Sequence, residues 1–293
     1  MVGMLKSGKW MLWILISVLL LSGCAMPSVG GEDPYVPMEL TGINPEGITL
    51  ETRFTPPEGF ARLEFGADAF GTFVRNYPLK EDGAPVLLYN GTKKPYQSFH
   101  AAVFALPIEN ADLQQCADSV MRMYAEYYWA IGQPEKLAFH FTNGFLCDYA
   151  RWRDGYRVKV RLNEAKWSKD ADFDDSHETF VKYLRQVFNY AGTLSMATYE
   201  TETVALEEMT VGDVILNGGS PGHVVMVVDV CENEDGQRAW LLAQGYMPAQ
   251  EFHVIRNPKH EADPWYYESE MEFPLKTAEY TFADAIMICR VTY

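Results

Sequence analysis

Residues 212–230 decide the fold of this chain: Gly212-Asp-Val-Ile-Leu-Asn-Gly-Gly-Ser-Pro-Gly-His-Val-Val-Met-Val-Val-Asp-Val230. Two apolar runs with the character of strands, 213–216 and 224–230, meet at a glycine-rich turn. The turn delivers one histidine, His223, to the start of the second strand. A histidine held there is suited to act as a general base, because its ordinary pKa lies near neutral pH.

The next apolar run, 239–244, ends in a polar residue, Gln244. Paired antiparallel strands bring the end of one strand beside the start of its neighbour. We therefore expect Gln244 at the same end of the sheet as His223, where its amide would orient the imidazole. Such a base and its orienting residue still need a nucleophile.

The first residues have the layout of a secretory signal. Lys6 and Lys9 precede an apolar run from Met11 to Leu21, and Leu21-Ser-Gly-Cys24 resembles a bacterial lipobox. This resemblance implies a lipoprotein signal peptide over 1–23, lipid on Cys24 and anchoring to a membrane of the cell envelope, the outer membrane if the cell is Gram-negative. An uncleaved anchor helix is the alternative. Residues 24–47 are rich in Pro, Gly and Ser, which is typical of a flexible tether.

Residues 48–293 are expected to form a single α+β domain. Aromatic residues make up 14% of the chain, which indicates a globular core. The net charge of −16 repels phosphate backbones, so nucleic acid is not an expected partner.

The domain contains four cysteines, Cys116, Cys147, Cys231 and Cys289. Their spacing does not suit a zinc site, and neither a metal nor another cofactor is expected. In an oxidising compartment they could pair as disulfides in three ways.

Apolar periodicity predicts helices early in the domain and a series of strands at its end, which is typical of an α+β fold. The expected helices are 67–77, 112–131 and 176–190. The expected strands are 60–65, 86–89, 99–106, 137–141, 156–162, 213–216, 224–230, 239–244, 252–255 and 285–291. Asp112 is the expected N-cap of the second helix, with Gln115 at position N3 of a capping box.

Cys116 is the candidate nucleophile. It lies one turn inside the helix expected from Asp112, where free backbone N–H groups and the helix dipole favour a thiolate. The same residue falls on the apolar stripe of that helix, so a core cysteine or half of a disulfide remains the alternative. Other candidates are weaker: His140 and His253 as bases lie in strand-like runs, and Ser195 lacks a nucleophile elbow.

Cys116, His223 and Gln244 occur in the chain order of the papain-like thiol hydrolases, which this arrangement resembles. The resemblance implies a buried helix that begins near the cysteine and packs on an antiparallel sheet or half-barrel carrying the histidine. It also implies that a glutamine near the cysteine assists the oxyanion, and Gln114 is the candidate because Gln115 suits the capping box.

Residues from Phe173 onward resemble the NlpC/P60 branch of cell-wall peptidases. The matching elements are Phe173-Asp-Asp-Ser176, Gly212-Asp213 and His223. Asp175 stands where that branch has its cysteine, and a carboxylate cannot replace a thiolate in acyl transfer. If the matching elements correspond in this order, Asp175 lies beside His223 and the chain has a peptidase fold without peptidase chemistry. Whether Cys116 or Asp175 lies beside His223 therefore decides between a thiol hydrolase and a degenerate peptidase.

The mature chain is also identified as similar to a bacterial lipoprotein family, domain-of-unknown-function family 4846. The similarity rests on 112–118, 141–145, 190–195, 218–223 and 242–250. The sequence thus predicts a lipid-anchored thiol hydrolase that acts on amide or peptide bonds of the cell envelope. The alternative is a non-catalytic envelope lipoprotein that binds peptidoglycan or a protein partner.

Overall fold

The computed structural model describes residues 37–219, 221–283 and 287–293. The expected signal peptide, the lipidated Cys24 and the first part of the tether lie outside these residues. The described residues belong to one compact unit. Helices and antiparallel strands are both present, so the expectation of an α+β chain is confirmed.

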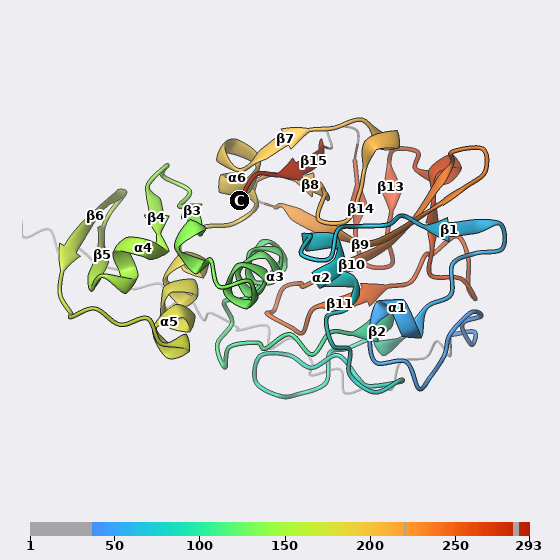
Figure 1. Cartoon of the computed structure of the whole chain (residues 1–293), viewed down its shortest axis with the longest axis horizontal. Helices are drawn as coiled ribbons and strands as arrows, with labels where there is room; N and C mark the ends of the chain where they lie inside the picture. Colours follow the sequence, from blue (N-terminus) through green and yellow to red (C-terminus); the bar gives the residue numbers. More distant parts are fainter. Residues whose placement is uncertain (1–36, 220, 284–286) are drawn as a thin grey trace, which may run out of the picture. The chain divides into compact units, whose positions relative to one another are not determined.

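The main sheet has nine strands, and all of its pairings are antiparallel. Its order is β2 (His100–Val103), β11 (His253–Ile255), β10 (Arg238–Gln244), β9 (His223–Asn233), β8 (Val214–Asn217), β15 (Met287–Val291) and β7 (Thr201–Thr203). The short strand β1 (Phe60–Arg62) pairs with β9 (Figure 1). Another short strand, β12 (Tyr266–Tyr267), pairs with β10. The two apolar runs at 213–216 and 224–230 therefore form the central hairpin β8–β9.

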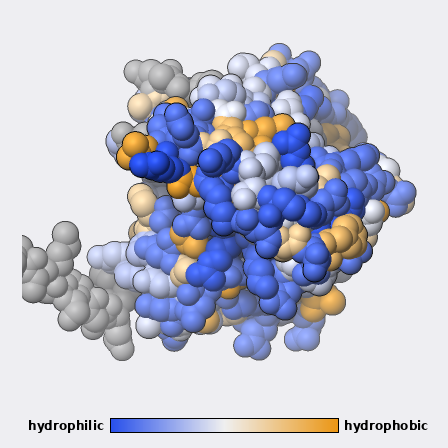
Figure 2. All heavy atoms as spheres, turned by 90° about the vertical axis from the view of Figure 1, so that its left-hand side faces the viewer, coloured by the Kyte–Doolittle hydropathy of each residue, from blue (hydrophilic) through white to orange (hydrophobic). Residues whose placement is uncertain are grey.

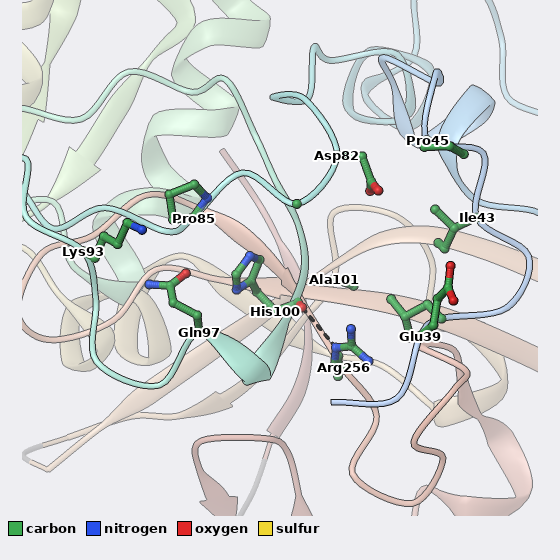
Figure 3. A pocket seen from close by; sticks show the side chains of 12 residues that line it. Glu39, Ile43, Pro45, Asp82, Pro85, Lys93, Gln97, His100, Ala101 and Arg256 are labelled. Atoms are coloured by element: carbon green, nitrogen blue, oxygen red, sulfur yellow. Dashed lines mark hydrogen bonds between the residues drawn. The ribbon is translucent and has the colours of Figure 1, made fainter. Parts of the chain in front are cut away.

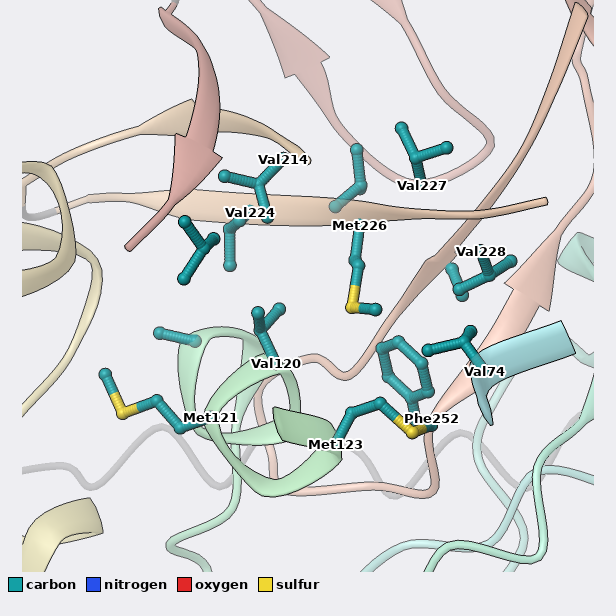
Figure 4. Packing of buried hydrophobic residues seen from close by; sticks show 14 of the residues in the cluster. Val74, Val120, Met121, Met123, Val214, Val224, Met226, Val227, Val228 and Phe252 are labelled. Atoms are coloured by element: carbon teal, nitrogen blue, oxygen red, sulfur yellow. The ribbon is translucent and has the colours of Figure 1, made fainter. Parts of the chain in front are cut away.

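Strand β9 reads as a continuous apolar run because it lies in the middle of the core. Helix α3 (Cys116–Ala130) and helix α2 (Phe70–Arg75) both contact it. Val120 of α3 faces Val224 and Met226 of the strand, and Met123 lies beside Phe252 (Figure 4). This packing fixes where the first turn of α3 lies relative to the start of β9.

The remaining elements surround this sheet. Three separate hairpins are β3 (Ala138–His140) with β4 (Leu146–Asp148), β5 (Tyr156–Arg161) with β6 (Glu164–Lys169), and β13 (Leu275–Lys276) with β14 (Thr281–Phe282). The other helices are α1 (Leu50–Arg53), α4 (Tyr149–Arg153), α5 (His177–Phe188) and α6 (Thr193–Tyr199). Short 3-10 turns occur at Gln97–Phe99, Pro134–Lys136, Leu206–Glu208 and Glu268–Glu270. No helix among the described residues has the length and apolar character needed to cross a membrane.

The second expected helix begins later than predicted. Asp112 is not its N-cap, because the carboxylate of Asp112 accepts the backbone N–H of Ala249 instead. The N-cap is Gln115, whose backbone N–H donates to the carboxylate of Asp118 at 3.0 Å. Cys116 is consequently the first residue of α3 rather than one turn inside it.

One predicted strand is absent, and one helix was not predicted. Residues 86–89 form isolated bridges, Leu87 with Lys93 and Leu88 with Gln250, and no strand. Helix α6 was not expected, because its seven residues are too few to show apolar periodicity. The expected helix over 176–190 is present as α5, with Ser176 as its N-cap.

Candidate functional site

His223 and Gln244 meet at one end of the main sheet. Strand β9 begins at His223 and the antiparallel strand β10 ends at Gln244. Nε2 of His223 lies 2.8 Å from Oε1 of Gln244. Both side chains are buried, with exposed fractions of 2% and 0%. The structure therefore brings these two residues into direct contact, without assigning either a chemical role.

Glycine at position 222 permits the sharp turn before His223. A Cβ at Gly222 would lie 2.5 Å from the carbonyl oxygen of Gly219 and 2.8 Å from that of Asn217. Both atoms belong to the backbone, so they cannot move aside as the end of a side chain would. The glycine-rich sequence is thus required by the close backbone approach that precedes β9.

The start of α3 lies beside the same end of the sheet. A Cβ on Gly245, the residue after Gln244, would lie 2.3 Å from Oγ of Ser119 and 2.9 Å from the carbonyl oxygen of Gln115. The backbone N–H of Val224, next to His223, interacts with the sulfur of Cys116. Cys116 and His223 are therefore neighbours, although no hydrogen bond joins Sγ to the imidazole among the contacts of the described residues.

The helix start at Asp175 lies elsewhere. Asp175 acts electrostatically on Tyr149 of α4, and the neighbouring Asp174 bonds to Ser176 and Thr179 at the start of α5. The helix start that meets β9 is thus the one with a thiol. All four cysteines of the described residues are free, so Cys116 is not part of a disulfide.

Burial keeps both candidate reactive groups neutral. It raises the pKa of the Cys116 thiol to about 11, and the Asp118 carboxyl adds to the rise while nearby backbone N–H groups oppose it. Burial lowers the pKa of His223 to about 4, against the opposing effects of Gln244 and Glu279. At neutral pH the resting site holds a thiol and an uncharged imidazole rather than an ion pair.

Asp118 lies two residues after Cys116 and is buried, whereas Cys116 itself is half-buried. Burial raises the pKa of its carboxyl to about 8, against the lowering effect of the backbone N–H of Gln115. Below that pH the group carries little negative charge. A thiolate on Cys116 would then meet no strong repulsion from its own helix.

Glu279, which binds the other end of the Gln244 amide, was not predicted as a site residue from the sequence. Glu279 lies in the turn between β13 and β14, and its Oε2 accepts a hydrogen bond of 2.8 Å from Nε2 of Gln244. Its Oε1 forms an ion pair of 2.6 Å with the buried Lys94, and its Oε2 lies 3.5 Å from Nε2 of His253. Burial opposes its ionisation, but His253 and Lys94 together hold the pKa of Glu279 below its usual value. No motif marks Glu279 or Lys94 in the sequence, because each contributes only through distant partners.

Aromatic side chains cover the imidazole. The ring of His223 lies 4.7 Å from those of Tyr246 and Tyr280 and 5.9 Å from that of Phe282. Tyr280 and Phe282 belong to the hairpin β13–β14 and its turn, which also supplies Glu279. This cover removes water from His223 and explains the lowered pKa of its side chain.

Gln114 is fully buried beside the start of α3. Its Nε2 donates to the carbonyl oxygen of Pro107 at 3.2 Å, while its Oε1 has no partner among the described residues. One hydrogen of the Nε2 group is thereby used and one remains. The backbone N–H of Cys116, at the first position of α3, is a second potential donor at this place.

The weaker candidates have other partners. Nδ1 of His140 lies 3.4 Å from Glu200, and its ring stacks on Tyr199. Nε2 of His253 lies 3.5 Å from the carboxylate of Glu279. Ser195 bonds within the first turn of α6 to the backbone of Gly192. None of the three shares a described contact with Cys116.

A cavity of about 540 Å³ lies away from Cys116, between β2 and the chain near residue 40 (Figure 3). His100, Asp82 and Arg256 are among its lining residues. Burial lowers the pKa of His100 to about 4. Among the described residues, no cluster of three or more His, Cys, Asp or Glu side chains has the arrangement needed to hold a metal ion.

Comparisons with known proteins identify the family and nothing further. Residues 50–288 match the family model described as domain of unknown function (4846). The match spans most of the chain, so the chain belongs to this family. No curated protein and no solved structure matches the chain.

Proposed function

We propose that this member of the family is a papain-like thiol hydrolase, held in the cell envelope by lipid on Cys24, that cleaves an amide or peptide bond. One observation carries the proposal: the first residue of α3 is a cysteine, and the backbone N–H of Val224, next to His223, lies near enough to its sulfur to favour the thiolate. The contact between His223 and Gln244 supports it, because a base with its orienting residue stands beside that thiol. Peptidoglycan peptides are the substrate class we favour, since the lipid would place the enzyme among them.

The hydrogen bonds around Gln244 favour one form of the imidazole. The carboxylate of Glu279 can only accept, so the Gln244 atom facing it is the NH₂ group and the atom facing His223 is the carbonyl oxygen. Nε2 of a neutral His223 must therefore carry the hydrogen, which leaves the lone pair on Nδ1. We infer that Nδ1 is the general base.

The proposed reaction begins with transfer of the thiol proton of Cys116 to Nδ1 of His223. The sulfur attacks the substrate carbonyl carbon, and the oxyanion receives hydrogen bonds from the backbone N–H of Cys116 and from Gln114. His223 then returns the proton to the leaving amine as the C–N bond breaks, which forms a thioester. Water, deprotonated by His223, hydrolyses the thioester and regenerates the thiol.

Reaction of the folded protein with iodoacetamide and with a peptidyl electrophile tests this proposal. Wild type should be modified at Cys116, and the peptidyl reagent should react there faster than its intrinsic reactivity explains. Cys116→Ala should lose this product and retain its fold, as judged by circular dichroism. Equal labelling of Cys116→Ala and wild type would contradict the assignment of the nucleophile.

A non-catalytic envelope protein that binds peptidoglycan or a protein partner is the second candidate. The aromatic cover over His223 favours it, because an enzyme must admit substrate to its base. Binding of peptidoglycan fragments that is equal in wild type and Cys116→Ala, without peptidyl labelling of either, would support this second function.

A further inference from the structure

The hairpin β5–β6 reverses the charge of the chain around it. Residues 156–169 contain five Lys or Arg and one Asp or Glu, whereas the whole chain has a net charge of −16. The hairpin lies at one side of the described unit (Figure 1). Figure 2 shows that side, where hydrophilic residues dominate and apolar residues form small separate patches.

The two faces of the hairpin differ. Val158 and its partner Trp167 lie on the face that packs against the core, together with Val160 and Ala165. The opposite face carries Lys159, Arg161 and Lys166. The alternation of side chains along a strand thus separates an apolar inner face from a basic outer one.

Repulsion between like charges on the basic face lowers the stability of the hairpin. Lys159 and Lys166 are direct cross-strand partners, and like charges in that position destabilise a sheet. Lys159 is balanced by Asp170 at 2.5 Å. Arg161 and Lys166 have no ion pair among the described residues, although Glu164 is the cross-strand partner of Arg161. Both basic residues line a surface cavity of about 530 Å³ together with Glu164, Asn143 and Asn163. An anionic partner would compensate these charges.

The tip of the hairpin adds an apolar contact. Leu162 is 96% exposed, and its φ of 55° is unusual for a residue other than glycine. It stands directly after Arg161, between the two strands. A leucine projecting beyond basic residues matches a surface that is anionic outside and apolar beneath.

We propose that the β5–β6 hairpin docks on an anionic phospholipid surface, with Arg161 and Lys166 at the headgroups and Leu162 inserted between them. The apolar run from Met11 to Leu21 and the lipobox-like Cys24 independently favour a chain held at a membrane. Docking would set the orientation of the domain on that membrane. This inference does not depend on the thiol site, so a failure of the proposed hydrolase activity would not contradict it.

Hydrogen exchange at the hairpin tip tests it in the full chain, associated with vesicles. Amides of residues 161–164 should exchange more slowly on vesicles of equal parts phosphatidylcholine and phosphatidylglycerol than on phosphatidylcholine alone. Each basic residue near such a surface contributes about fivefold, so Arg161→Gln with Lys166→Gln should weaken the docking equilibrium about 25-fold. High salt should have the same effect.

A matched control removes two exposed lysines outside the hairpin, Lys93→Gln with Lys136→Gln, and should leave the exchange difference unchanged. Leu162→Asn should reduce it without altering the charge. Equal exchange on the two vesicle types, or an equal loss in the control, would overturn the proposal. Protection by a soluble glycerol phosphate polymer in the absence of anionic lipid would also overturn it, because it would assign the basic face to a dissolved anion.

Discussion

Gln244 links His223 to Glu279: its Oε1 lies 2.8 Å from Nε2 of the imidazole, and its Nε2 donates to the carboxylate at the same distance. The amide thereby connects a buried ion pair, Glu279 with Lys94, to His223. Any chemistry at His223 depends on this link, because the position of the imidazole hydrogen follows from it.

Gln244→Ala should lower the reactivity of Cys116 while leaving the thiol in place. Without the amide, the imidazole loses the partner that fixes its tautomer, so less of it presents Nδ1 as a base. We expect the iodoacetamide rate constant at neutral pH to fall about tenfold, which corresponds to one pKa unit. Mass spectrometry of the peptide containing Cys116 measures the rate. Gln237→Ala, at an exposed glutamine, is the control, and an unchanged rate in Gln244→Ala would contradict a positioning role.

The thiol of Cys116 should titrate at unusually high pH. Burial raises its pKa to about 11, so the alkylation rate should still rise, about tenfold per pH unit, above the range where an ordinary thiol levels off. Asp118→Asn should lower that pKa, because the carboxylate opposes the thiolate; Asp154→Asn, at an exposed position, should not. A rate that is already constant below about pH 8 would indicate a Cys–His ion pair and contradict this prediction.

Gly245→Ala should push α3 away from the sheet. Its Cβ would lie 2.3 Å from Oγ of Ser119 and 2.9 Å from the backbone oxygen of Gln115, so the helix start must shift. We expect a loss of about 1–3 kcal/mol in the free energy of unfolding, measured with urea. Gly66→Ala is the matched control, because a Cβ there meets nothing within 4 Å. Equal stability of the two variants would argue against the tight contact.

Acid should destabilise the fold partly through His223. Burial lowers its pKa to about 4, whereas the unfolded side chain titrates near 6.5. The unfolded state therefore binds more protons between these values, so the contribution is fully present above about pH 6.5 and is lost as the pH falls through about 4. Its upper bound is about 3 kcal/mol.

Urea unfolding at several pH values should show a smaller loss of stability between neutral pH and about pH 4 in His223→Gln than in wild type. His177→Gln, at an exposed histidine, should keep the wild-type dependence. A pH dependence that is the same in all three proteins would mean that His223 is not buried in its neutral form.

The α+β class and most of the strands followed from the sequence because they depend on local patterns. Apolar runs bounded by glycine predicted β8, β9 and β10, and helical periodicity predicted α3 and α5. The contact between His223 and Gln244 was also expected, because antiparallel neighbours must bring the end of one strand beside the start of the next. The short helix α6 was missed because it lacks such a pattern, whereas the apolar run at 86–89 predicted a strand where the structure has only isolated bridges.

The sequence by itself determined which residues were available: a histidine opening a strand, a glutamine ending the next one and a cysteine early in an amphipathic helix. The tertiary structure alone decided that α3, and not α5, meets β9, and that α3 begins at Cys116. Asp112 does not cap the helix because its carboxylate accepts the amide of Ala249, 137 residues away, and the N-cap is Gln115 instead. Glu279 and Lys94 likewise join the site only through chain folding. Contacts between residues so far apart arise from packing of the whole core, which no local pattern encodes.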